Sequence, residues 1–183
     1  MLMSKLGKKS IEIPKETKVK LENGKLLVSG PKGSQEIPIN EKIFSTSVSK
    51  ENILSIKPMT KNSNDSIKKT WGMTRSLVNN AIIGVTSGYE KILEMTGVGY
   101  RASLKDNKLV LQLGFSHNIE YQIPDSVKIA VEKQTVIKIN GNDKAQIGRI
   151  AAEIKSFRPT EPYKGKGIKE KGQYVLRKEG KKK

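Results

Sequence analysis

Residues 18–30 read KVKLENGKLLVSG, and this stretch carries the strongest indication of the fold. Apolar and charged residues alternate on both sides of Asn23-Gly24. Such alternation is typical of strands with one buried face, and Asn-Gly suits the tight turn between two strands because both residues tolerate positive φ. The stretch therefore predicts an antiparallel β-hairpin, with apolar positions at Val19, Leu21, Leu26 and Val28.

The same alternation predicts two more hairpins. One spans residues 100–113 and turns at Asp106-Asn107, and the other spans residues 127–139 and turns at Lys133-Gln134. Shorter apolar runs predict single strands, which supports a fold dominated by antiparallel pairing. These runs lie at residues 34–39, 53–57, 91–96 and 119–123.

A first helix is expected in the N-terminal half. It begins at Asn64 or Asp65, and Gly84 is expected to end it. Small and apolar residues recur along it at intervals of three and four, which places them on one face. They are Ile67, Trp71, Thr74, Val78 and Ala81. Trp71 is therefore expected in the core rather than on an exposed stacking surface.

A second helix is expected nearer the C-terminus. Asp143 suits its N-cap, with Gln146 three residues later as the capping-box partner. Pro159 ends it, because proline cannot continue a helix. Its apolar face holds Ile147, Ile150, Ala151 and Ile154.

The two halves of the chain repeat one pattern. Ile13-Pro14 and Ile123-Pro124 each precede a hairpin, and the hairpins are offset by 110 residues before the turn and 111 after it. We therefore expect an α+β fold built by duplication, in which each domain is an antiparallel β-sheet packed on one α-helix. The expected domains are residues 1–82 and 83–183, the second with a basic C-terminal extension at residues 155–183.

The charge of the chain indicates an anionic partner. Lys and Arg number 35 against 18 Asp and Glu, giving a net charge of +17, and residues 155–183 alone hold 11 basic and 3 acidic residues. Nucleic acid and an anionic membrane surface both fit such an excess. No apolar run approaches the roughly 20 residues of a membrane span, and residues 1–14 lack the apolar stretch of a secretory signal. No membrane partner and a cytoplasmic location are therefore expected.

Few residues suit catalysis or metal binding. Cysteine is absent and His117 is the only histidine, which excludes thiolate sites and His-cluster metal sites. The stretch GVGYRA at residues 97–102 imitates a dinucleotide-binding fingerprint, but strand-like alternation follows where that fingerprint needs a helix. We expect no cofactor, no metal, a β-bulge or close backbone packing at these glycines, and a turn or surface role for His117.

Residues 155–168 read KSFRPTEPYKGKGI and combine the features of an RNA-binding segment. The cations can neutralise phosphates, Tyr163 offers an aromatic plane, and Gly165 and Gly167 let the main chain approach a ligand closely. Pro159 and Pro162 interrupt helix and sheet and favour a defined loop. The alternative is a flexible basic tail without a fixed partner.

At this motif the chain resembles the bacterial-type ribosomal protein L6 family of the large subunit. Further stretches match in order and spacing along nearly the whole chain: MSKLGKK at 3–9, GPKG at 30–33, GVGYRA at 97–102, GFSH at 114–117, EPYKGKGI at 161–168 and KEGK at 178–181. The match at 3–9 makes Met3 an alternative initiator. Ser10 and Thr160 stand where the family usually has proline, and Leu6 where it usually has isoleucine.

The resemblance implies a structural protein rather than an enzyme. It implies binding to large-subunit rRNA near the sarcin–ricin loop and the base of the factor-binding stalk, beside neighbouring ribosomal proteins and where translation GTPases dock. The ribosome would be cytoplasmic, with an organellar ribosome as the alternative. The expected rRNA contacts are Lys155, Arg158, Tyr163, Lys164, Gly165, Lys166, Gly167, Lys169, Lys171, Arg177, Lys178 and Lys181, with Lys5, Lys8 and Lys9 as secondary candidates.

Two other classes of protein fit the charge less well. A DNA-compacting architectural protein needs an apolar wedge beside a basic arm, and the sequence offers none. A basic enzyme acting on nucleic acid needs paired carboxylates or histidines in a cleft, and the sequence holds no such cluster.

Overall fold

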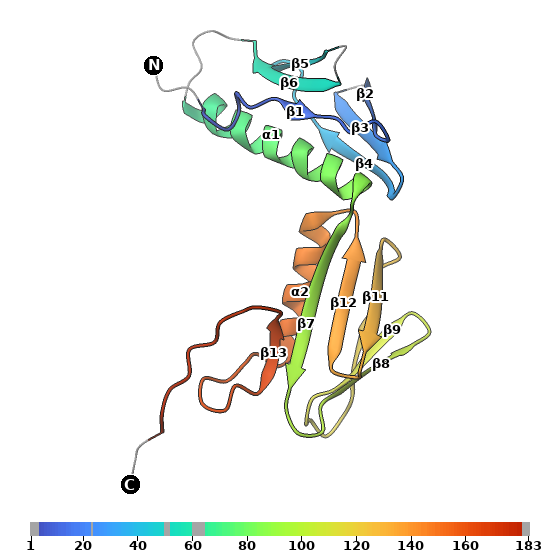
Figure 1. The fold of residues 1–183 in the computed structure, drawn as a ribbon, viewed down its shortest axis with the longest axis vertical. Helices are drawn as coiled ribbons and strands as arrows, with labels where there is room; N and C mark the ends of the chain where they lie inside the picture. The colour runs from blue at the N-terminus through green and yellow to red at the C-terminus, as the bar shows by residue number, and fades with distance from the viewer. Residues whose placement is uncertain (1–3, 23, 50–51, 60–64, 181–183) are drawn as a thin grey trace. The chain divides into compact units, whose positions relative to one another are not determined.

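The computed structural model describes residues 4–22, 24–49, 52–59 and 65–180. The chain divides into two compact units, Met1–Gly88 and Tyr89–Lys183. Each unit combines antiparallel strands with one α-helix, which confirms the predicted α+β fold (Figure 1). The predicted boundary after Ile82 falls inside the first helix, because the last turn of that helix packs in the first unit, where Val85 is fully buried.

Two three-stranded antiparallel sheets and one helix make up the described part of the first unit. The sheets have the strand orders β1-β6-β5 and β2-β3-β4, and the helix packs against β3, β4 and β6. Trp71 lies in the core as predicted, and its Nε1 donates to the carbonyl of Ile56 at 2.7 Å. The elements are β1 (Ile11–Glu12), β2 (Lys18–Glu22), β3 (Lys25–Gly30), β4 (Gly33–Pro38), β5 (Phe44–Val48), β6 (Ile53–Pro58) and α1 (Asp65–Thr86).

The second unit has a four-stranded sheet of order β11-β12-β7-β13 and a three-stranded sheet of order β10-β9-β8. Its helix packs against β7, β12 and β13 of the larger sheet. Figure 1 shows β13 at the edge of β7, with the C-terminal segment continuing beyond it. The elements are β7 (Tyr89–Thr96), β8 (Arg101–Lys105), β9 (Lys108–Gln112), β10 (Ile119–Gln122), β11 (Val127–Glu132), β12 (Val136–Gly141), α2 (Lys144–Phe157) and β13 (Gly167–Glu170).

The two units repeat one order of elements and one pattern of strand pairing. β1 pairs with β6 as β7 pairs with β12, and the sheet β2-β3-β4 corresponds to β8-β9-β10. Lys18 and Arg101 begin equivalent strands 83 residues apart. The same spacing relates five pairs of buried residues: Leu26/Leu109, Val28/Leu111, Phe44/Val127, Leu54/Ile137 and Ile56/Ile139.

This correspondence confirms the duplication but corrects the predicted offset of 110 residues. That offset matched β2-β3 with β11-β12, whereas the pairing matches β2-β3 with β8-β9 and β11-β12 with β5-β6. The error has a physical cause, since every antiparallel hairpin with one buried face shows the same alternation. β13 has no counterpart in the described part of the first unit.

Each helix differs from expectation in one feature: α1 ends later than predicted, and the predicted capping box of α2 does not form. α1 continues past Gly84 to Thr86, and Gly88 follows it with a φ of 76° and an N–H that donates to the carbonyl of Ile83. Asp143 caps α2 as predicted, accepting from the N–H of Ala145 at 2.8 Å. Gln146 does not complete a capping box, because its amide donates to Ser126 Oγ instead.

Of the two glycines in residues 97–102, Gly97 serves close packing as expected, whereas Gly99 has a φ of 78° and a β carbon there would meet nothing within 4 Å. A β carbon at Gly97 would lie 2.7 Å from the Tyr100 ring, so the absent side chain makes room for that ring. β8 follows at Arg101, where a dinucleotide fingerprint would need a helix. His117 is exposed, and its ring stacks on that of Phe115 with 6.2 Å between centroids.

Candidate nucleic-acid interface

The basic C-terminal segment is built into the second sheet rather than hanging free from it. Ile168 on β13 is fully buried and lies opposite Met95 of β7. Its N–H donates to the carbonyl of Arg158 at 2.9 Å. The alternative of a flexible basic tail therefore does not hold at β13, where an edge strand and a core side chain fix the segment.

Gly167 permits this strand to pass close to its own chain. Its φ is 134°, and a β carbon there would lie 2.6 Å from the carbonyl oxygen of Pro159 and from Cα of Thr160. Gly167 is also buried. Its close approach is therefore to the backbone of residues 159–160.

Ion pairs tie β13 to its neighbours. Glu170 accepts from Lys91 on β7 at 3.1 Å and from Lys155 on α2 at 3.3 Å, and Lys169 pairs with Glu94 on β7 at 3.5 Å. The hydrogen bond from Lys91, reinforced by Lys155, lowers the pKa of the Glu170 carboxyl. Lys155 and Lys169 are thus both engaged by carboxylates within the fold.

A closed loop precedes β13 and presents cations to solvent. The N–H of Glu161 donates to the carbonyl of Lys166 at 2.9 Å and closes the loop. Lys164 and Lys166 are exposed, and Tyr163 is 59% exposed. No carboxylate pairs with either lysine in the part of the chain that the structure describes. The loop therefore carries two free positive charges and an accessible aromatic ring.

A strap follows β13, which we define as residues 173–178. It is anchored at both ends, since the N–H of Gln173 donates to the carbonyl of Glu170 at 3.0 Å and the N–H of Lys178 donates to that of Pro162 at 2.8 Å. Lys171, Arg177 and Lys178 are exposed. The strap thereby brings Arg177 and Lys178 beside the closed loop.

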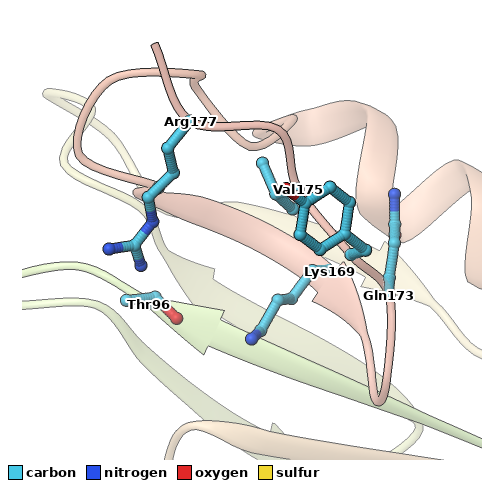
Figure 2. Close-up of a pocket in the computed structure, with 7 residues that line it drawn as sticks. Thr96, Lys169, Gln173, Val175 and Arg177 are labelled. Carbon is cyan, nitrogen blue, oxygen red and sulfur yellow. The ribbon is translucent and has the colours of Figure 1, made fainter. Parts of the chain in front are cut away.

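A pocket of about 370 Å³ lies beneath the strap, and we call it the strap pocket. Its lining includes Thr96 at the end of β7, Lys169 on β13, and Gln173, Tyr174 and Arg177 of the strap. Figure 2 shows the Arg177 guanidinium and the Lys169 ammonium pointing toward Thr96. Gly165 lies next to the guanidinium with a φ of 70°, and a β carbon there would be at ordinary contact distance, 3.4 Å, from Arg177.

Arg158 stands apart from the strap pocket. It caps the C-terminus of α2, donates from Nε to the Tyr100 hydroxyl at 3.2 Å and lies over the Phe115 ring, 5.1 Å from its centroid. The side chain remains exposed. Arg158 thus connects the basic segment with two loops, at residues 97–102 and 114–117, through Tyr100 and Phe115.

The secondary candidates belong to the first unit. Lys5, Lys8 and Lys9 are exposed on the N-terminal segment. Arg75 on α1 holds that segment by donating to the carbonyls of Lys9 and Ser10, each at 3.2 Å. The predicted contact Lys181 lies outside the described residues.

Sequence reasoning missed Thr96, Gln173 and Tyr174 as residues of a candidate site. Tyr174 carried a usable signal, because it is a second aromatic residue within the basic segment and is 84% exposed. Thr96 carried none, since only the docking of the strap against β7 places it in the pocket.

The described residues hold no group of three or more His, Cys, Asp or Glu side chains that could bind a metal ion. Among the same residues, α1 and α2 are both too short or too polar to cross a bilayer.

Comparison with known proteins identifies the class to which this fold and surface belong. The profile of the family described as ribosomal protein L6 matches residues 96–171. The large ribosomal subunit protein uL6 of Sphingopyxis alaskensis is 46% identical over 99% of this chain and all of its own length, and that of Staphylococcus epidermidis is 45% identical over 98% of each chain. The chain belongs to the ribosomal protein L6 family. It is a structural ribosomal protein and not an enzyme.

Proposed function

We propose that the protein holds large-subunit rRNA in place as a component of the large ribosomal subunit, on ribosomes in the cytoplasm. The observation that carries the proposal is the set of exposed cations around the closed loop and the strap. Lys164, Lys166 and Arg177 have no carboxylate partner among the described residues. Family membership supports RNA as the anion, because the relatives are named as large-subunit proteins.

The arrangement suits a folded RNA better than a simple polyanion. Cations neutralise phosphates where RNA segments converge, and each contact releases bound counterions. A surface that is fixed before binding discriminates shape, whereas a mobile tail only attracts charge. The anchored strap and the closed loop supply such a fixed surface. The proposed contacts are Tyr163, Lys164, Lys166, Lys171, Arg177 and Lys178, with Lys5, Lys8 and Lys9 as secondary contacts.

We further propose that this surface lies near the sarcin–ricin loop and the base of the factor-binding stalk, where translation GTPases dock beside neighbouring ribosomal proteins. Membership of the ribosomal protein L6 family supports this position. The protein would hold RNA segments in place there, where translation GTPases dock.

Sedimentation tests assembly into the subunit. Tagged protein should migrate with free large subunits in a sucrose gradient at low magnesium and with whole ribosomes at high magnesium. A variant with Lys164, Lys166 and Arg177 changed to Gln should shift toward the top of the gradient, because its phosphate contacts are lost. Wild-type protein that stays at the top of both gradients would contradict the proposal.

Directed cleavage tests the position. The chain has no Cys, so Lys164→Cys creates a single tether for an iron chelate that cuts nearby RNA. Cleavage should fall in the sarcin–ricin loop and its neighbours. Lys133→Cys, on the β11–β12 turn, controls for cleavage that does not depend on position. Cleavage elsewhere from the Lys164 tether would place the surface on different RNA.

A further inference from the structure

The strap pocket has the composition of a nucleotide site. Its lining carries two cations, Lys169 and Arg177, and no carboxylate. Thr96 and Gln173 add a hydroxyl and an amide that can bond to sugar or base edges. The volume of about 370 Å³ lies within the range of pockets that enclose small organic ligands.

Arg177 is the better placed of the two cations to bind a phosphate. Lys169 already pairs with Glu94 at 3.5 Å, which offsets part of its charge. Arg177 has no carboxylate partner within the described chain, and its planar guanidinium can donate two parallel hydrogen bonds to a phosphate. The guanidinium lies beside Gly165, another residue of the pocket lining.

Tyr174 supplies the surface for a base. Its side chain is 84% exposed, so no core packing explains an aromatic residue at this position. Val175 beside it is half-buried and gives the pocket an apolar edge. An exposed aromatic side chain can stack on a nucleobase. Such stacking discriminates little among the bases, because every base has a flat π face.

The pocket is formed before any ligand arrives. Hydrogen bonds at Gln173 and Lys178 fix both ends of the strap, and β13 forms the floor through its pairing with β7. A site held in its bound shape loses little conformational entropy on binding.

We propose that the strap pocket binds one unstacked nucleotide of the RNA, with its base on Tyr174 and its phosphate at Arg177. The proposal rests on the proposed function and specifies which part of the RNA the surface takes up. A paired base is buried in its helix, so the nucleotide must come from a bulge, a loop or a junction. A free nucleoside monophosphate has the same chemistry and is the other possible source.

Chemical footprinting of large-subunit rRNA with dimethyl sulfate tests the proposal. The full-length protein should protect one unpaired base that Tyr174→Ala leaves reactive and Tyr174→Phe still protects. Tyr174→Ala should weaken binding by about 5- to 150-fold, as stacking of one base predicts. The neighbouring Leu176, also exposed, gives the matched control Leu176→Ala, which should leave protection and melting temperature unchanged.

The outcomes separate this proposal from the proposed function. A footprint that is identical for wild type and Tyr174→Ala overturns the pocket proposal and leaves rRNA binding intact. No footprint at all overturns the proposed function. Adenosine 5′-monophosphate is titrated in parallel while amide signals of the strap are followed by NMR. If adenosine 5′-monophosphate saturates the pocket but no rRNA base loses its protection in Tyr174→Ala, the ligand is a free nucleotide and not a nucleotide of the RNA.

Discussion

Lys155 on α2 and Glu170 on β13 form an ion pair with 3.3 Å between Nζ and Oε1. Glu170 also accepts from Lys91 on β7, so one carboxylate joins the edge strand to both of its neighbours. Lys155 is therefore engaged within the fold, although its sequence context suggests a phosphate contact. The basic residues divide into a group that fixes β13 and a group that faces solvent.

This division predicts opposite effects for two lysine substitutions. Lys155→Gln should lower the free energy of unfolding by up to about 1 kcal/mol, as expected for a partly exposed ion pair, and should leave rRNA affinity unchanged. Lys164→Gln should weaken rRNA binding and leave stability unchanged. Urea unfolding and filter binding on both variants provide the check, and the reverse pattern would show that the division is wrong.

The Glu170 pairs predict a specific dependence of stability on pH. The hydrogen bond from Lys91 and that from Lys155 lower the pKa of Glu170 in the folded state below its ordinary value of 4.5. A lowered folded-state pKa contributes stability above the unfolded-state pKa, and this contribution is lost as the pH falls through the folded-state pKa. Glu170→Gln should therefore be less stable than wild type at pH 7, and the difference should shrink in acid. A difference that stays constant from pH 7 to pH 3 would be inconsistent with these ion pairs.

Two glycine-to-alanine substitutions should have opposite signs. Gly167→Ala places a β carbon 2.6 Å from the Pro159 carbonyl at a φ of 134°, so it should destabilise the protein by roughly 1–3 kcal/mol. Gly148 lies within α2 and a β carbon there meets nothing within 4 Å. Gly148→Ala should stabilise by about 0.5–1 kcal/mol. Denaturant midpoints of both variants measure the effects, and destabilisation by Gly148→Ala would contradict the description of α2.

The two units should fold separately. Each has its own buried cluster, with Val28 and Val78 in the first and Leu93 and Ile137 in the second. Fragments 1–88 and 89–183 should each unfold cooperatively and give dispersed amide signals in NMR spectra. If neither fragment shows dispersed signals, the units depend on each other and are not separate domains.

The sequence predicted the elements that depend on residues close together in the chain, such as hairpins and a helix cap. The first two hairpins have the registers that their two-residue turns predict, with Val19 opposite Val28 and Leu104 opposite Leu109. The third hairpin forms where expected, but its turn also includes Thr135, because Glu132 lies opposite Val136. Asp143 was recognisable as an N-cap because its side chain bonds to a backbone N–H two residues away. These features need no knowledge of the rest of the chain.

Features that depend on distant residues were not predictable in this way. β13 follows a proline-rich and glycine-rich stretch, and it becomes a strand because Ile168 enters the core beside Met95 of β7. The strap pocket depends on the same docking, which brings Arg177 toward Thr96. The correct repeat was hidden because hairpins of one kind resemble each other in sequence, and only strand pairing distinguishes them.

The salt dependence of rRNA binding tests the central claim, that the solvent-facing cations of the C-terminal segment carry the interaction. Deleting residues 155–183 would also remove the buried Ile168, so the charges are better removed from the intact chain. One variant changes Lys164, Lys166, Lys171, Arg177 and Lys178 to Gln. A control variant makes the same change at five exposed lysines of the first unit, Lys15, Lys18, Lys20, Lys42 and Lys57.

Filter binding to a large-subunit rRNA fragment across a range of salt concentrations gives the slope of log K against log salt for each protein. Each phosphate contact contributes about 0.7 to 0.9 to this slope. The C-terminal variant should therefore flatten the slope by roughly 3.5 to 4.5, while the control changes it much less. An unchanged slope for the C-terminal variant, or an equal loss in the control, would contradict the claim and place the RNA-binding surface elsewhere.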